Sequence, residues 1–148
     1  MKKIFLGLCT ILLAGCSGDD IKTVQNGLMD FNKTVTVGQA LNNWSSCHTK
    51  EWKESKAING TRVVEFKCAH NMTNWVDKAI DTWGERGGSE DLDIVASSTD
   101  LQFTMNVDNS FQVEKITSTI RWKDGKVAIW DEDDVVKKLK NIYNNEPE

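Results

Sequence analysis

Two cysteines and two histidines are the residues of this chain that come closest, by type and spacing, to a chemical site. Cys47 is followed directly by His48, and one residue separates Cys68 from His70. Thiolates and imidazoles are zinc ligands, but this spacing differs from the gaps of about two to four residues in common zinc fingers. Adjacency does not make Cys47 and His48 a catalytic dyad either, because such pairs meet in space rather than in sequence.

The amino-terminal segment bears on the state of these thiols. Met1–Lys3 is basic, residues 4–13 are mainly apolar, and Ala14-Gly15-Cys16 follows. A basic start, a short apolar run and a small-residue site are typical of a secretory signal. The apolar run is shorter than the ~20 residues that a membrane-spanning helix needs. We therefore expect residues 1–15 to be a signal peptide.

Leu13-Ala14-Gly15-Cys16 resembles the lipobox of bacterial lipoproteins. This resemblance implies cleavage before Cys16, a diacylglyceryl group on its thiol, and acyl chains such as palmitate that anchor the protein stably in a membrane. An ordinary signal peptide with a chance cysteine is the alternative. In a Gram-negative host, Ser17 at the next position implies sorting to the outer membrane, with the domain facing the periplasm.

Processing would leave one pair of thiols. Cys9 lies in the expected signal peptide and Cys16 is expected to carry lipid, so Cys47 and Cys68 remain. An even pair of cysteines in an oxidising compartment is typically disulfide-bonded. We predict a Cys47–Cys68 disulfide, with zinc binding and free thiols as the alternatives, and expect no metal or other cofactor.

Size and charge limit the classes of function. Cleavage of the 148-residue chain after residue 15 would leave 133 residues, which suits a single domain. The remaining segment holds 16 basic and 22 acidic residues. Such an acidic domain argues against binding nucleic acid or an anionic lipid surface. We expect residues 16–34 to be a lipidated amino terminus and tether, and residues 35–146 to be one α+β domain.

The first half of that domain shows a helix and a hairpin. Thr36 and Gln39 have the spacing of a capping box, and a short apolar helical stripe follows as far as Trp44. Residues 50–58 and 61–70 are predicted to pair about Asn59-Gly60. A three-residue loop would place Trp52 opposite Cys68 on the face shared with Phe66, whereas a two-residue loop would pair it with Lys67.

The second half is predicted to hold a helix, a meander and a final helix. Residues 71–86 repeat apolar side chains at helical spacing, and residues 101–107, 111–122 and 127–130 read as three antiparallel strands. Alternation changes phase at Glu114-Lys115, which predicts a bulge. The fold class is therefore α+β, with an antiparallel sheet of about five strands, a hairpin plus a three-stranded meander, packed by two to three helices. The final helix should start near Asp133 and bury Val135, Val136, Leu139, Ile142 and Tyr143.

Tryptophans and an acidic run are the remaining candidate sites. Trp44, Trp75 and Trp83 lie on helical stripes and are expected in the core. Strand residues can face either side, so exposed tryptophans of the sheet could bind a sugar or a peptide. Residues 131–134 are all acidic; they lack the loop geometry of a calcium site and favour a helix start instead. The strand tryptophans that form this possible binding surface are Trp52, Trp122 and Trp130.

Several short segments resemble a family of small bacterial lipoproteins of uncharacterised function. They are the lipobox, Thr36-Val37-Gly38-Gln39-Ala40-Leu41, Asn59-Gly60 and Val63-Val64-Glu65-Phe66. The resemblance implies a fold and brings no catalytic residue. The order of helix and hairpin is also similar to that of outer-membrane assembly lipoproteins and of β-lactamase inhibitor proteins, at the level of fold alone.

These features favour a non-enzymatic lipoprotein of the cell envelope that binds a protein partner or assists envelope assembly. The sequence lacks a glycine-rich phosphate loop, a serine nucleophile elbow, His-Glu-x-x-His and Cys-x-x-Cys. An inhibitor or ligand-binding module that uses the exposed tryptophans is the alternative. An enzyme built on Cys47, His48 or His70 is the third hypothesis.

Substitution of the expected lipid acceptor tests the anchor. Cys16→Ser removes the thiol that a diacylglyceryl group requires, so incorporation of labelled palmitate should fall to background and unprocessed precursor should accumulate. Metabolic labelling followed by immunoprecipitation measures both. Normal palmitate incorporation in this variant would show that Cys16 is not the acceptor.

Overall fold

The structure, a computed structural model, describes residues 18–72 and 93–146. Five antiparallel strands form the main sheet in the order β3-β4-β5-β6-β7, and β1 and β2 form a separate two-stranded sheet. The α+β fold, the hairpin and the three-stranded meander are confirmed. The predicted helix over residues 71–86, with Trp75 and Trp83, lies almost entirely outside the described residues. The elements are α1 (Asp19–Asn26), β1 (Leu28–Met29), β2 (Asn32–Thr36), α2 (Val37–Asn42), β3 (Cys47–Lys56), β4 (Arg62–His70), β5 (Ile94–Met105), β6 (Phe111–Trp122), β7 (Val127–Asp131) and α4 (Val135–Tyr143).

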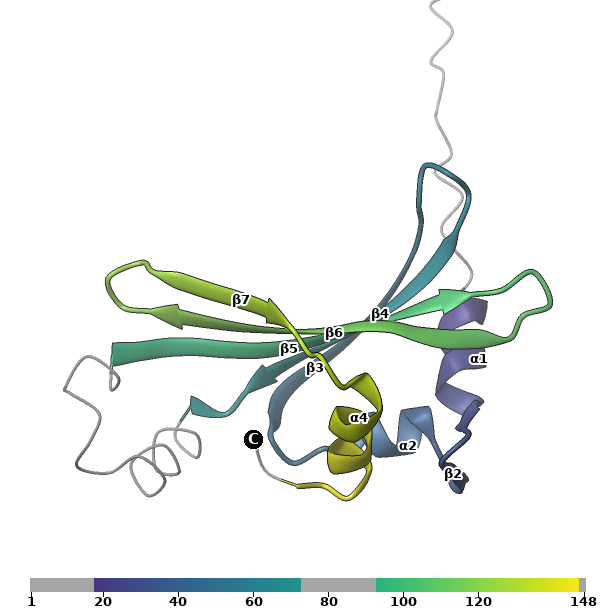
Figure 1. Cartoon of the computed structure of the whole chain (residues 1–148), viewed down its shortest axis with the longest axis horizontal. Coiled ribbons are helices and arrows are strands. Elements are labelled where there is room, and N and C mark those ends of the chain that lie inside the picture. The colour runs from purple at the N-terminus through teal and green to yellow at the C-terminus, as the bar shows by residue number, and fades with distance from the viewer. Residues whose placement is uncertain (1–17, 73–92, 147–148) are drawn as a thin grey trace, which may run out of the picture.

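One face of the main sheet is apolar, and the described helices all lie against that face (Figure 1). Alternate residues of each strand point to this side, because side chains alternate between the faces of a strand. Trp44, which follows α2, is fully buried, as predicted. None of the described helices is long and apolar enough to cross a membrane. The core on this face includes Val64, Phe66, Leu101, Phe103 and Ile116 from the strands, and Val24, Leu41, Leu139 and Ile142 from the helices.

The short helix α2 begins with the predicted capping box. The Thr36 hydroxyl accepts a hydrogen bond from the Gln39 amide at 3.1 Å, and the Gln39 side chain accepts one from the Thr36 amide at 2.9 Å. Both bonds satisfy amides that lack partners within the helix. This fixes where α2 starts and directs Leu41 into the core.

The Cys47–Cys68 disulfide is present, with Cα atoms 5.2 Å apart. It joins the start of β3, which follows α2, to the buried face of β4. The cysteines are 21 residues apart, and closing a loop of this length stabilises the fold by roughly 3 kcal/mol in the chain-entropy model. The bond occupies both thiols, and no group of three potential metal ligands occurs in the described part of the chain.

His70 lies buried beside this disulfide. Its Nε2 is 2.8 Å from the Thr99 hydroxyl oxygen, and its ring packs edge-on against Trp44 with centroids 5.4 Å apart. If Nδ1 carries the proton toward the Ser46 carbonyl oxygen at 3.3 Å, Nε2 accepts from Thr99. His70 therefore joins β4 to β5 inside the core.

The register of the first hairpin differs from the prediction. Trp52 pairs with Phe66, and Lys50 pairs with Cys68. The Ala57 amide bonds to the Thr61 carbonyl at 2.8 Å, so the three-residue loop comes one position earlier than expected. A shift of two in the pairing keeps every side chain on its predicted face, because strands have a period of two.

Bulges interrupt the strand pairing of the main sheet at three places. Gln102 pairs with Lys115 and Phe103 with Val113, so Glu114 is the extra residue, as the phase change predicts. Further extra residues are Val95 in β5 and His48 in β3. A bulge bends its strand and increases the local twist, so these positions curve the sheet.

The expected tether over residues 16–34 is wrong from Asp19 onward, because α1 belongs to the domain. Val24 is fully buried in the core. Glu54 of β3 accepts from the Gly18 amide at 2.8 Å and from the Ile21 amide at 3.3 Å. The ion pair between Arg62 and Asp20, at 2.8 Å, adds a second link to the sheet. Two apolar residues in one turn were too sparse a pattern to show this helix in the sequence.

The final helix α4 begins as the acidic run predicts. The Asp134 side chain accepts from the Lys137 amide at 2.9 Å and caps the helix. Leu139 and Ile142 are buried, but Val136 is 52% exposed, so its predicted place on the apolar face is wrong. Val136 lies one position round the helix from Val135, which packs against the core.

A matched pair of valine substitutions tests the role of α1. Val24→Ala removes two buried methyl groups and should lower the free energy of unfolding by about 2 kcal/mol. Val136→Ala removes the same groups from an exposed site and should change it by less than about 0.5 kcal/mol. Urea denaturation of both variants measures the difference. Equal, small effects would show that α1 contributes no packing.

Candidate functional site

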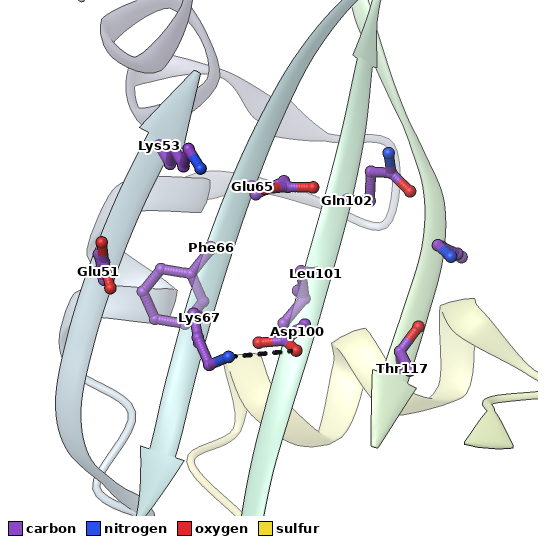
Figure 2. Close-up of a pocket in the computed structure, with 10 residues that line it drawn as sticks. Glu51, Lys53, Glu65, Phe66, Lys67, Asp100, Leu101, Gln102 and Thr117 are labelled. Atoms are coloured by element: carbon purple, nitrogen blue, oxygen red, sulfur yellow. Dashed lines mark ion pairs between the residues drawn. The ribbon is translucent and has the colours of Figure 1, made fainter. Parts of the chain in front are cut away.

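The face of the sheet opposite the helices is hollow and open. Figure 2 shows its centre, where side chains from β3, β4, β5 and β6 surround a hollow of about 550 Å³. Phe66 and Leu101 border the hollow, although both residues are fully buried and belong to the core on the other side. We call this surface the concave face. Its side chains are those of Glu51, Lys53, Glu65, Lys67, Asp100, Gln102, Lys115 and Thr117.

Strand pairing arranges these side chains in two rows across the sheet. In one row, Lys67 lies between Glu51 and Asp100. In the other, Glu65 lies between Lys53 and Gln102, and Gln102 pairs with Lys115. Opposite charges therefore face each other across the strands, which is the favourable arrangement for cross-strand pairs. The concave face holds three carboxylates and three ammonium groups, so it is neutral within an acidic chain.

Curvature of the sheet produces the hollow. The Glu114 bulge directly precedes Lys115, and the His48 and Val95 bulges lie in the same sheet. The hairpin that joins β3 and β4 rises on the side away from the helices, and so does the turn between β6 and β7 (Figure 1). The phase change that sequence alone indicates is therefore one cause of the concave face.

Asp100 is the least solvated charged group of the concave face. Its Oδ2 is 3.9 Å from the Lys67 ammonium nitrogen, and its Oδ1 is buried with no hydrogen-bond partner among the described residues. Burial raises the pKa of the Asp100 carboxyl above its ordinary value of 3.8. Lys67 lowers that pKa and Glu65 raises it, both by a smaller amount. One oxygen of the Asp100 carboxylate is thus buried without a donor from the described residues.

The three tryptophans proposed as a binding surface lie on the other side of the sheet. Trp52 packs on Phe66 at 4.8 Å between centroids, and its indole donates to Asn42 at 2.9 Å. Trp130 pairs with Ser118, whose face continues along β6 to Trp122. Trp122 and Trp130 are about 13 Å apart along the strand direction, because four residues separate their positions. They do not form a joint platform, and none of the three lines the concave face.

Sequence reasoning missed the concave face for an identifiable reason. Charged residues at alternate positions of a strand are normal on a solvated face, so each strand alone shows nothing unusual. The signal appears only when the register places the rows side by side and the bulges curve them. Cys16 lies outside the described residues. Comparison of the chain with protein-family models, curated proteins and solved structures finds no match.

Acid titration tests the setting of Asp100. A carboxyl whose pKa is raised by folding destabilises the folded state when it ionises, so stability falls as pH rises from about 3.8 through the raised pKa. Asp100→Asn removes that charge and should raise the melting temperature at pH 7, with a smaller gain below pH ~4. Thermal unfolding followed across pH measures the difference.

Asp108 supplies a control with the opposite sign. Hydrogen bonds from Ser110 lower the pKa of the Asp108 carboxyl in an exposed turn. Asp108→Asn should therefore leave the melting temperature unchanged or slightly lower at pH 7, and the loss should vanish in acid. An Asp100→Asn variant that behaves like Asp108→Asn would contradict the environment described for Asp100.

Proposed function

We propose that this protein is a non-enzymatic lipoprotein of the cell envelope that binds another folded protein through its concave face. The observation that carries the proposal is the contrast between the two faces of one sheet. Helices cover the apolar face, whereas no described helix covers the concave face, which the fold has curved around a hollow. A curved, exposed surface with fixed charges suits a convex surface of a partner.

The chemistry of the concave face favours a protein over a small molecule. Small-molecule sites are mostly apolar with few polar groups, whereas charged and amide side chains line this hollow. Exposed cross-strand ion pairs contribute little to stability, so their arrangement is free to serve recognition. Complementary charge patterns select a partner and speed its approach more than they add affinity. The partner should therefore present alternating charges rather than one sign.

Anchoring and location rest on the sequence. Lipid on Cys16 would hold the protein at a membrane, and Ser17 favours the outer membrane in a Gram-negative host. The Cys47–Cys68 disulfide supports a location outside the cytoplasm, because disulfides persist in oxidising compartments and are rare in the reducing cytoplasm. An accessory role in envelope assembly fits a small tethered domain whose concave face has a fixed shape and a fixed pattern of charges.

Site-specific photocrosslinking tests the concave face. The photoreactive amino acid p-benzoylphenylalanine should replace Gln102 in the hollow, and Val136 on exposed α4 as the control. In living cells, position 102 should yield one discrete crosslinked protein, and position 136 should not yield the same one. Identical crosslinks at both positions, or none at position 102, would contradict the proposal.

A charge swap gives a second, composition-matched test. Glu65→Lys with Lys67→Glu exchanges two neighbouring charges of β4 and keeps the net charge of the chain. Both side chains are exposed, but the swap places a carboxylate at position 67 between Glu51 and Asp100, so the melting temperature should fall. Circular dichroism at the temperature of the crosslinking experiment checks that the double variant is folded. The crosslink from position 102 should fall at least tenfold, because the row pattern that the partner reads is inverted. An unchanged crosslink in a folded double variant would show that the charges do not select the partner.

A further inference from the structure

Strand β7 is an edge of the main sheet, and its unpaired side is apolar. Among the described residues it pairs with β6 alone, and in Figure 1 it runs along β6 to the start of α4. Val127 is 44% exposed, Ile129 67% and Trp130 43%. Edge strands of this kind present free backbone groups together with apolar side chains, which is a template for pairing with another strand.

The opposite edge of the same sheet is protected against such pairing. Strand β3 carries five charged residues and contains the His48 bulge. Charged side chains and bulges are devices that prevent an edge from pairing with another chain. Because β7 between Lys126 and Asp131 has neither, the two edges differ in their capacity to accept a strand. The charged residues of β3 are Lys50, Glu51, Lys53, Glu54 and Lys56.

Two hydrogen bonds show which backbone groups of β7 point away from β6. The Glu132 amide donates to the Ile116 carbonyl at 2.8 Å, and the Lys126 carbonyl accepts from the Trp122 amide at 2.9 Å. Bonded and non-bonded residues alternate in an antiparallel pair, so the even-numbered residues of β7 point their backbone groups toward β6. The amides and carbonyls of Val127, Ile129 and Asp131 therefore point to the outer edge.

We propose that two copies of this chain pair antiparallel through β7, with Ile129 facing Ile129 on the two-fold axis. In this register Val127 of each copy faces Asp131 of the other, and all the outward backbone groups are paired by about six hydrogen bonds. The two five-stranded sheets then become one continuous sheet. This interface uses none of the eight side chains that define the concave face, although Asp131 accepts a hydrogen bond from Thr117 at its border. It does not depend on the lipid anchor.

Side chains are compatible with this register. On the helix side, Trp130 of one copy lies opposite the small Ala128 of the other, which leaves room for the indole ring. Lys126 lies opposite Glu132, so opposite charges flank the pair and no like charges face each other. A register centred on Asp131 would instead place two carboxylates together on the axis. Self-complementarity of this kind is what a two-fold interface requires.

Cysteine crosslinking tests the register in the purified full chain with Cys9 and Cys16 replaced by serine, because these two cysteines lie outside the Cys47–Cys68 disulfide and could crosslink by themselves. Hydrogen-bonded antiparallel partners have Cα atoms ~5.5 Å apart, a distance that a disulfide spans. With mild oxidation, Ile129→Cys should give at least tenfold more covalent dimer than Ile58→Cys, which lies in the β3–β4 loop, and than the unsubstituted chain. Val127→Cys alone should give little, because its own counterpart lies about 13 Å away in the dimer. Mixed Val127→Cys and Asp131→Cys chains should crosslink to each other.

Sedimentation equilibrium gives an independent measure. The unsubstituted chain should form dimers, and Ile129→Lys should shift it to monomers with an unchanged circular dichroism spectrum, because position 129 is exposed in the single chain. A monomeric unsubstituted chain would overturn the proposal. So would Ile129→Cys crosslinking no better than Ile58→Cys, or Val127→Cys crosslinking as well as Ile129→Cys.

Discussion

The fold depends on a sheet that is apolar on only one of its faces. Phe66, Leu101 and Phe103 supply that face, and the helices must cover it because exposed apolar area of this size is unfavourable in water. The hydrophobic effect thus draws α1, α2 and α4 to the same side. The same constraint leaves the other face without a covering helix among the described residues, since burying its charged side chains would not stabilise the fold. Packing and availability for binding are two results of one residue pattern.

Two further features convert this one-sided sheet into a shaped surface. The Cys47–Cys68 disulfide fixes the segment after α2 to the sheet, next to buried His70 and Trp44. The bulges at His48, Val95 and Glu114 bend the strands that the disulfide and the core hold in place. Each bulge leaves one residue without its backbone hydrogen bonds to the neighbouring strand. Apolar packing in the core, on the convex side of the sheet, offsets that loss of stability. The hollow therefore persists in the absence of a partner.

The sequence predicts the local features well and their assembly less well. The capping box at Thr36, the bulge at Glu114, the helix start at the acidic run and the disulfide each follow from a few neighbouring residues or from pairing of cysteines. The register of the first hairpin and the burial of α1 do not, because they depend on contacts distant in sequence, such as Glu54 with Gly18. The concave face could not be predicted for the same reason. Its rows exist only once four strands are aligned. Trp52, one of the three tryptophans that the sequence offers as a binding surface, packs on Phe66 instead.

The bond between Gly18 and Glu54 also limits how far the domain can travel. Since α1 starts at Asp19 and is held to β3, only about two residues separate the folded body from Cys16, a reach of roughly 7 Å when extended. A lipid on Cys16 would therefore be joined to the folded domain by almost no flexible linker. A domain of this size has a radius of gyration of about 14 Å, so it would sweep only a thin layer of the periplasm beside the bilayer. The domain would then diffuse in two dimensions, and it would meet only those proteins that enter this layer.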